Sequence, residues 1–416
     1  MKNFKLLPVS IAVAATLASA SSFAADDVAS LEQRIQELEA KVVTLDYVDD
    51  QQQSALTSET PAPLGIVFSG YARYGAAYQE GDSKYVSVGS TGAAVGRLGN
   101  EMNGGEFQLG KVFETESGQK WNVAVMLDHW SGEGWGNGLA LKKFYAGASN
   151  IFESQPDLYV WAGRDFHQRP QQGLNDYFWM SHDGQGGGFQ NFDFGGAKFD
   201  LGFVGQVNGE YDDENGNYAI TSKLHSIDAG IGNLDLYANY GFTSEKVDSS
   251  ETAFLLGATL GLGSSNKLVM KYGDGADNSV FELAGDKQVV YVSLEGGVNP
   301  SDKVFIDYLA SYKDISGKDA TEASEYSAIV RPMYNWDDTH STWLEAGVGM
   351  VDYADDGEDQ AWKVTLSQNI SMGGLPWSRP MLRFYATVGD VESKGTNVPT
   401  TNVDTLTLGA MFEAWW

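Results

Sequence analysis

Three stretches of the sequence place aromatic and charged side chains on one face of an extended chain. Ser69, Tyr71 and Arg73 occupy alternate positions, whereas Phe68 and Tyr74 occupy positions of the opposite parity. Successive side chains of a strand point to opposite faces, so each set shares a face. Two later stretches repeat the pattern with the sets Trp377, Arg379, Met381, Arg383 and Tyr385, and Thr407, Gly409, Met411, Glu413 and Trp415.

Aromatic rings beside charged groups can bind sugars. A ring face packs on the flat C–H face of a sugar, while charged groups hydrogen-bond its hydroxyls. Such a face indicates a passage or groove for sugars. The alternative is that a β-bulge shifts the parity and each ring belongs to an interfacial girdle, but three strands give the same answer.

Catalytic motifs are absent from the sequence. The five histidines are scattered at His129, His167, His182, His225 and His340, none in a Gly-x-Ser-x-Gly setting, and His182-Asp183 is typical of a loop pair. Asp212 to Asn215 could hold Ca²⁺ but lacks the full ligand spacing and is typical of a solvated turn. The glycine-rich run 184–188 has no phosphate-binding lysine. We therefore expect no enzyme, no cofactor and no metal site.

Composition narrows the class of protein further. The chain has 416 residues, a net charge of −29, 49 Gly, 20 Phe, 20 Tyr, 11 Trp and no Cys. The absence of cysteine excludes disulfides and thiolate metal sites, and the acidic balance argues against a nucleic-acid partner. Abundant glycine and aromatic residues favour one large β unit.

The N-terminus has the features of an export signal. Lys2 and Lys5 precede an apolar run from Leu6 to Leu17, and small residues end at Ala24. This pattern predicts a signal peptide over residues 1–24. The apolar run is too short to be a membrane anchor.

Two further segments precede the main body. Residues 25–48 carry Val28, Leu31, Ile35, Leu38, Val42 and Leu45 at spacings of 3, 4, 3, 4 and 3, which predicts a short α-helical coiled coil in the periplasm. A lone helix would leave this seam uncovered, so we expect oligomerisation, although the helix could instead lie on its own barrel. Residues 49–64 form a polar linker with Pro61 and Pro63.

Residues 65–416 alternate with a period of two. Leu234, Leu236, Ala238, Tyr240 and Phe242, for example, share one face of an apolar and polar alternation. A soluble sandwich and a transmembrane barrel both give this pattern. Runs of about ten residues fit a tilted bilayer crossing and favour an all-β transmembrane antiparallel barrel in outer-membrane lipid.

Six ordered blocks resemble the sugar-specific porins of the Gram-negative outer membrane, typified by maltoporin. They are 68–73 (FSGYAR), 97–101 (RLGNE), 161–169 (WAGRDFHQR), 331–334 (RPMY), 377–380 (WSRP) and the terminal Trp415-Trp416. The coil before the barrel resembles the branch typified by the sucrose porin. The resemblance implies a homotrimer of barrels with about 18 strands in the bacterial outer membrane, each pore narrowed by an inward loop.

The resemblance also implies the residues of the sugar path. Its aromatic members here would be Tyr71, Trp135 (or alternatively Trp130), Phe178, Trp377 and Trp415. The polar constriction would comprise Arg73, Arg97, Glu106, Lys142, Arg169 and Asp176, with Lys142 the loosest match.

Several positions depart from the family pattern. An expected aromatic falls at Gly104 or Gly105 and another near Ser265, while a constriction tyrosine is replaced by Phe178. Two expected acids are Gln171 and Ser181, and the barrel region is short for the family. We therefore expect trimmed external loops and a wider, less selective pore.

Two other functions remain open at this point. A general diffusion porin would have a charged eyelet without a sugar path. Alternatively, the coil and linker could be the functional part, reaching into the periplasm or cell wall to tether or to present captured sugar.

Overall fold

The computed structural model describes residues 65–131, 138–206, 216–244, 251–263, 265–395 and 398–416. The expected signal peptide, coiled coil and linker over residues 1–64 lie outside this range, as does Trp135. Within the ranges described, no helix is long and apolar enough to cross a membrane.

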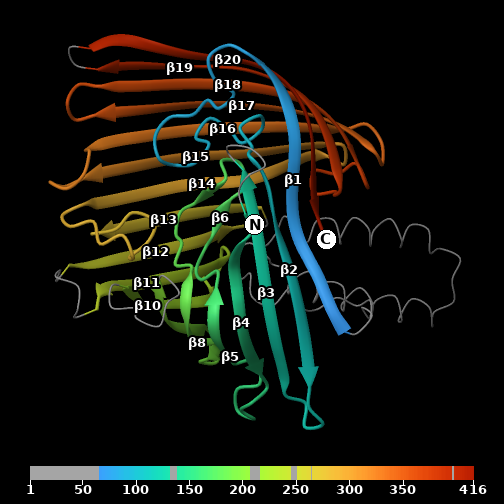
Figure 1. Ribbon diagram of the computed structural model, residues 1–416, viewed down its shortest axis with the longest axis vertical. Helices are drawn as coiled ribbons and strands as arrows, with labels where there is room; N and C mark the ends of the chain where they lie inside the picture. Colours follow the sequence, from blue (N-terminus) through green and yellow to red (C-terminus); the bar gives the residue numbers. More distant parts are fainter. Residues whose placement is uncertain (1–64, 132–137, 207–215, 245–250, 264, 396–397) are drawn as a thin grey trace, which may run out of the picture.

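Eighteen strands form a single antiparallel wall that follows the order of the chain (Figure 1). These strands are β1 (Ile66–Glu80), β2 (Asn103–Glu114), β3 (Lys120–Ser131), β4 (Ala140–Ser149), β5 (Tyr159–Asp165), β8 (Gly184–Asp193), β9 (Lys198–Gln206), β10 (Asn217–Asp228), β11 (Asn233–Thr243), β12 (Thr252–Leu262), β13 (Asn266–Asp274), β14 (Gln288–Ser301), β15 (Val304–Ser316), β16 (Ala323–Asn335), β17 (His340–Tyr353), β18 (Glu358–Ser371), β19 (Met381–Gly395) and β20 (Val398–Trp415). The two remaining strands, β6 (Gln171–Gln172) and β7 (Tyr177–Phe178), pair only with each other.

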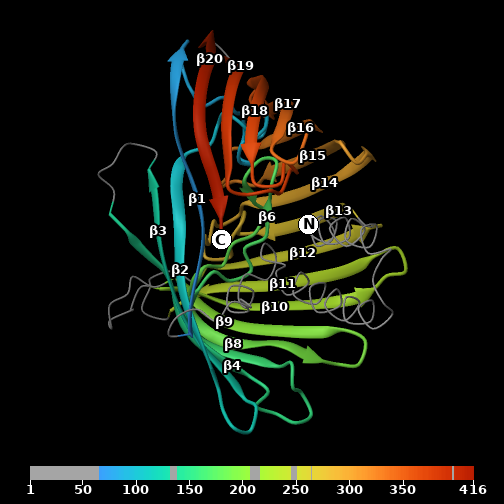
Figure 2. The ribbon, with the colours of Figure 1, turned by 90° about the vertical axis from the view of Figure 1, so that its right-hand side faces the viewer.

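The wall closes because β1 pairs with β20 as well as with β2. Figure 2 shows blue β1 beside red β20. The backbone groups of Gly70 and Trp416 exchange two hydrogen bonds of 3.0 and 3.1 Å at the end of this seam. Closure leaves no free strand edge, which is the condition for crossing lipid with strands. The expected barrel of about 18 antiparallel strands is confirmed.

Side chains alternate across the wall as the sequence predicts. On β20, Leu406 and Leu408 are exposed on the outer surface, whereas Thr407, Met411 and Glu413 are buried inside. β1 and β19 keep the same parity, with Phe68 and Phe384 outside and Arg73 and Arg383 inside. The outer belt is therefore apolar and the lumen carries the charges.

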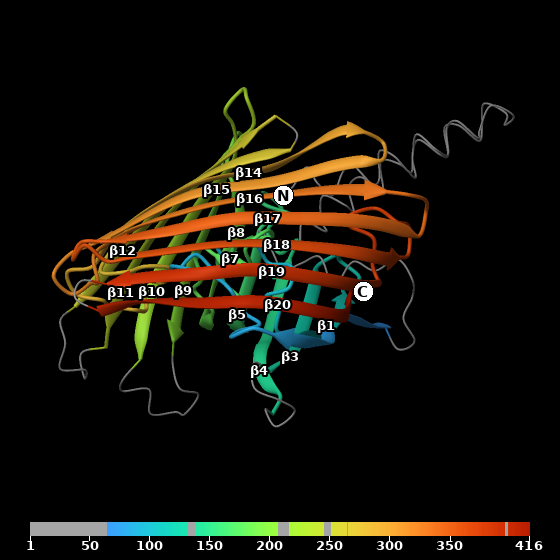
Figure 3. The same cartoon turned by 90° about the horizontal axis from the view of Figure 1, so that it is seen from above.

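The two ends of the barrel differ in their connections. One end has the short turns 115–119, 194–197, 229–232 and 302–303, and the other end has the longer segments 81–102, 166–183 and 275–287. Figure 3 shows β14 to β20 running side by side between these ends. In outer-membrane barrels the short turns lie on the periplasmic side, where residue 65 and the C-terminus would then also lie.

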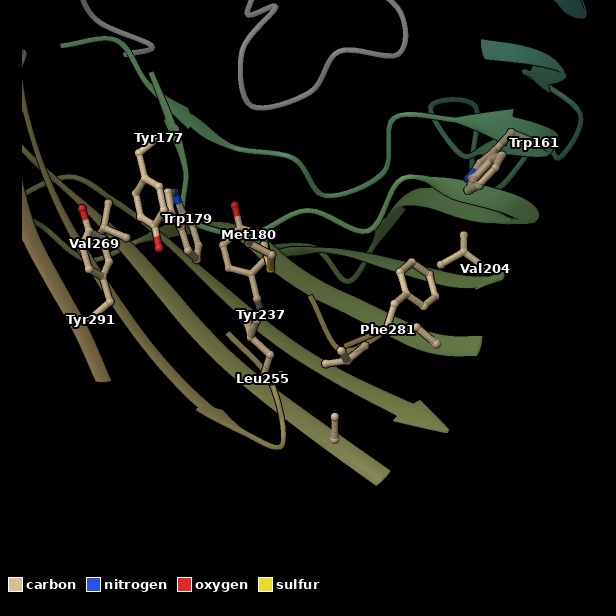
Figure 4. Close-up of a cluster of buried hydrophobic side chains, with 14 of the residues drawn as sticks. Trp161, Tyr177, Trp179, Met180, Val204, Tyr237, Leu255, Val269, Phe281 and Tyr291 are labelled. Carbon is tan, nitrogen blue, oxygen red and sulfur yellow. The ribbon is translucent and has the colours of Figure 1, made fainter. Parts of the chain in front are cut away.

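The segment 166–183 folds into the barrel and packs on its inner wall. Its side chains Tyr177, Trp179 and Met180 belong to one buried cluster with Val204, Tyr237, Leu255, Val269 and Tyr291 of the surrounding strands (Figure 4). Trp179 meets Tyr237 edge to face at 5.5 Å. Val280 and Phe281 of the segment 275–287 join the same cluster, so two inward segments fill this side of the lumen.

The segment 81–102 is held against the opposite wall by a buried carboxylate. Glu345 on β17 is fully buried; its Oε1 accepts the backbone N–H of Leu98 at 2.8 Å, and its Oε2 pairs with Arg331 at 2.5 Å. Lys363 on β18 lies 3.6 Å from Glu345 Oε1 and donates to the carbonyls of Gly96 and Leu98. This one side chain therefore joins the inward segment to two neighbouring cations of the wall.

Removing the charge of Glu345 should destabilise the barrel. Glu345→Gln leaves Arg331 and Lys363 buried without their carboxylate, which we expect to lower the free energy of unfolding by about 3 kcal/mol. The measurement is a urea titration in phospholipid vesicles, followed by tryptophan fluorescence. Glu358→Gln, which alters an ion pair with Lys394 and a hydrogen bond from the Gln360 amide at the surface, is the control and should change the free energy by about 0.5 kcal/mol or less. Equal effects of the two variants would show that the buried carboxylate is not an anchor.

Candidate pore constriction

The inward segments and the wall bring most of the arginines together. The described residues contain seven arginines, and six of them lie inside the barrel: Arg73, Arg97, Arg169, Arg331, Arg379 and Arg383. Arg164 faces outward, because it lies in register with exposed Phe144. Interior arginine requires carboxylate or aromatic partners, and these define the site.

The first group of contacts joins β1, β20 and the inward segments 81–102 and 166–183. Arg73 Nη1 lies 2.7 Å from Asp176 Oδ2 and donates to the hydroxyl of Tyr71 at 3.3 Å. Tyr71 in turn donates to Glu413 Oε1 at 2.9 Å. Arg97 from the segment 81–102 pairs with Asp176 at 3.7 Å and with Glu413 at 3.2 Å. Four predicted site residues, Tyr71, Arg73, Arg97 and Asp176, thus form one continuous polar chain with Glu413.

Glu413 is shared by three guanidinium groups. Its Oε2 accepts from Arg379 Nε at 3.1 Å and from Arg383 Nη2 at 3.1 Å, while Arg97 approaches Oε1. Arg383 also pairs with Glu101 Oε1 at 2.6 Å. Burial would raise the pKa of the Glu101 carboxyl, but Arg383, with Arg97 and Arg73, lowers that pKa below its ordinary value. The carboxylate of the inward segment therefore stays ionised.

Aromatic rings cover several of these guanidinium groups. The Cζ atom of Arg379 lies 4.2 Å from the ring centre of Trp415, and Arg383 lies 5.2 Å from that of Trp343. Trp377 packs edge to face on Phe305 at 5.5 Å, beside the same cluster. Cation–π contact of this kind stabilises an arginine that has left bulk water.

The second group lies on β2, the neighbour of β1, and on the segment 166–183. Arg169 is stacked between two rings, with Cζ 4.1 Å from the centre of Phe166 and 4.0 Å from that of Phe178. It pairs with Glu106 at 3.6 Å and with Asp183 at 3.2 Å. Burial raises the pKa of the Asp183 carboxyl, and Arg169 opposes that rise. One face of Phe178 is thus occupied by Arg169.

The structure explains the loose match at Lys142. The pairing of β3 with β4 slips between Met126 and Leu127, so that both Lys142 and Lys143 approach carboxylates of the inner wall. Lys142 lies 3.5 Å from Asp128, and fully buried Lys143 lies 3.2 Å from Asp165. Lys143 was not predicted, because a bulge cannot be located from alternation alone.

The Trp130 ring lies over Gly104, which with Gly105 is one of the two positions where the family resemblance leads us to expect a ring. Gly104 lies opposite Trp130 in register, and a Cβ on Gly104 would collide with the Trp130 ring. Trp130 is 6.3 Å from Tyr71 between ring centres and 5.2 Å from Cζ of Arg73. The ring therefore belongs to the lumen of its own barrel.

The structure also shows the contacts of Gln171 and Ser181, the two positions where the family resemblance leads us to expect acids. Gln171 donates its amide to Asp176 Oδ1 at 3.2 Å, and the backbone N–H of Ser181 donates to Asn278. His182 accepts from the backbone N–H of Val280. Among the described residues, no group of three histidine or carboxylate side chains could hold a metal ion.

Sequence reasoning did not select Trp343, Arg383, Glu101 or Glu413 as site residues. The parity of β19 and β20 had already placed Arg383 and Glu413 in the lumen, so the signal was present. Trp343 is buried among Arg331, Arg379 and Arg383, contacts that depend on how β17 and β19 pack with the inward segment.

Comparison with known proteins identifies the family of the chain. Residues 66–416 match the family model described as LamB porin. The chain is 27% identical over 415 residues to a maltoporin of Vibrio cholerae serotype O1, covering 87% of this chain and 97% of the relative. It is also 27% identical over 397 residues to the maltoporin of Photobacterium profundum, covering 84% and 94%.

Solved structures give a weaker similarity. An OmpT of Vibrio cholerae, in its trimer form, has a TM-score of 0.42 at 12% identity, with 84% of this chain and 99% of that chain covered. An anion-selective porin from Comamonas acidovorans has a TM-score of 0.41 at 12% identity, with the same coverage. TM-scores and identities of that size carry no information about function. The family model, in contrast, covers the whole barrel, and the chain belongs to the LamB porin family of outer-membrane channels, which are not enzymes.

Proposed function

We propose that the channel conducts sugars or oligosaccharides by facilitated diffusion along lumenal aromatics flanked by charged groups. The observation that carries the proposal is the contact of Tyr71 and Trp130 with Arg73, beside Asp176, at the meeting point of β1, β3 and the inward segment 166–183. A sugar requires aromatic ring faces and charge-assisted hydrogen-bond donors, and both kinds of group are in contact at this point of the lumen.

The aromatic members of this path are Tyr71, Trp130, Trp377 and Trp415, with Phe178 restricted to its one free face. Trp135 remains a candidate for entry from a neighbouring subunit. The polar members are Arg73, Arg97, Glu106, Lys142, Arg169 and Asp176, joined by Glu413. Because Arg97 belongs to the inward segment 81–102 and Arg169 to the inward segment 166–183, the position of those segments sets the width of the path.

We further propose that the barrel assembles as a homotrimer aided by the periplasmic coil over residues 25–48. The heptad seam of that coil supports the proposal, since its apolar positions need partners. The signal peptide over residues 1–24 would be removed on export, and the linker over residues 49–64 would separate the coil from the barrel.

A general diffusion porin is the second candidate. The charged groups around Arg97 and Arg169 resemble a charged eyelet, which would pass small solutes without a sugar path. The two candidates differ in whether sugars occupy the pore long enough to interrupt ion current.

Sugars should block the current in a saturable manner. Purified protein in a planar bilayer should open in three equal conductance steps, and maltotriose or sucrose should reduce the current along a binding isotherm. A current that no sugar alters would identify the general porin and overturn the sugar path.

Trp130 should contribute directly to sugar affinity. Trp130→Ala removes a ring worth about 1 kcal/mol of stacking, so the half-blocking sugar concentration should rise about fivefold. Trp121→Ala on the same strand is the matched control, because Trp121 faces outward and is 49% exposed. Unchanged block in Trp130→Ala would remove this ring from the path.

The coil should serve assembly and not conduction. Deleting residues 25–64 should lower the yield of trimer on non-denaturing gels, because the seam no longer holds the subunits together. Sugar block of the trimers that do form should be unchanged. A wild-type yield would contradict the assembly role, and loss of attachment to cell-wall material with conduction intact would favour a tether.

A further inference from the structure

We propose that the sugars favoured by this pore are acidic ones, oligosaccharides that carry carboxylate groups. This inference rests on the proposed function and specifies its substrate class. It is drawn from the placement of the arginines and from the balance of charge around them.

Arginine is concentrated in the lumen of a chain that is acidic overall. Six of the seven arginines described lie inside, although the whole chain has a net charge of −29. The guanidinium fork fits a carboxylate with two parallel hydrogen bonds, which an ammonium group cannot do. The lumen is therefore supplied with the side chain best suited to bind carboxylates.

Cations outnumber carboxylates around Arg97. Two neighbouring groups of ion-paired charges lie there. The first contains the cations Arg73, Arg97, Arg379 and Arg383 and the carboxylates Glu101, Asp176 and Glu413. The second contains the cations Arg331 and Lys363 and the carboxylate Glu345. Lys84 adds one cation through the carbonyl of Glu101, and Asp307, opposite Arg331 in register, adds one carboxylate. With these two residues included, the cations still outnumber the carboxylates by two.

The positive excess is local. Around Arg169 the cations Arg169, Lys142 and Lys143 face the carboxylates Glu106, Asp128, Asp165 and Asp183, so this neighbouring group has no positive excess. Salt limits the reach of an exposed charge to about 10 Å at 0.1 M. A permeant would therefore meet the excess only when it passes Arg97.

Arg97 has hydrogen-bonding capacity to spare. Its contacts with Glu413, Asp176 and Glu101 are ion pairs of 3.2, 3.7 and 4.0 Å, longer than a charge-assisted hydrogen bond. A ligand carboxylate would make a shorter, charge-assisted hydrogen bond to the Nη atoms of Arg97 than these protein carboxylates do.

The carboxylates of the cluster are already engaged. Asp176 is held by Arg73 at 2.7 Å and by the amide of Gln171, and Glu413 is shared by three arginines. Repulsion of an acidic ligand is reduced because each of these charges is neutralised nearby. Arg97 and Asp176 are also among the accessible members, with 13% and 23% of their side chains exposed.

The test compares two ligands that differ only in charge. Trigalacturonate and its fully methyl-esterified form share chain length and linkage, and each is titrated against single-channel current in about 0.1 M KCl. We expect trigalacturonate to half-block the wild-type trimer at about one tenth of the concentration that the ester needs.

Three variants assign the difference to Arg97. In Arg97→Gln the two ligands should block at concentrations within about twofold of each other, whereas Arg97→Lys should keep part of the preference because it keeps the charge. Lys318→Gln, which removes a charge from a side chain that is 90% exposed, is the control and should keep the wild-type ratio.

The outcomes separate this inference from the proposed function. Equal block by acid and ester, or tighter block by the ester, would overturn the acidic preference and leave the sugar channel standing. A tenfold preference that persists in Arg97→Gln would overturn the role of the arginine cluster. Current indifferent to maltotriose, ester and acid alike would instead remove the sugar channel itself.

Discussion

Every feature of this molecule depends on the need to pair each backbone group of a chain that crosses lipid. Strands can meet that need only if the first and last pair with each other, and β1 and β20 do so from Tyr71 opposite Trp415 to Glu80 opposite Leu406. Closure then fixes which side chains face inward. Because the seam strands carry Tyr71, Arg73 and Glu413, the joint that seals the barrel also supplies one wall of the constriction.

A barrel of 18 strands is too wide for wall side chains to fill, so chain segments must enter it. The apolar parts of those segments pack on one side, as Trp179 does against Tyr237. Elsewhere they are held by ion pairs such as Arg383 with Glu101 and Lys313 with Asp277. Removing one member of a buried pair costs more than the pair contributes, so these contacts determine where the segments lie. The constriction is what remains between them.

Alternation in the sequence was sufficient to predict the barrel and the inward face of β1, β19 and β20, because a period of two is a local property. It placed Arg73, Arg383 and Glu413 correctly in the lumen. It could not locate the bulge that brings Lys143 to Asp165, since a single unpaired residue leaves no mark on composition. Nor could it pair Arg97 with Glu413, because that contact joins an inward segment to a strand far away along the chain.

The contact of Trp130 with Gly104 shows how a ring can reach one part of the lumen from the neighbouring strand. A ring leaning across a glycine from the neighbouring strand covers the same part of the lumen as a ring on that glycine's own strand. A permeant meets only the surface, so either strand can supply the platform beside Tyr71 and Arg73. Two residues that lie opposite each other on neighbouring strands should therefore be compared as a pair, because an aromatic residue at either position can cover the same part of the lumen.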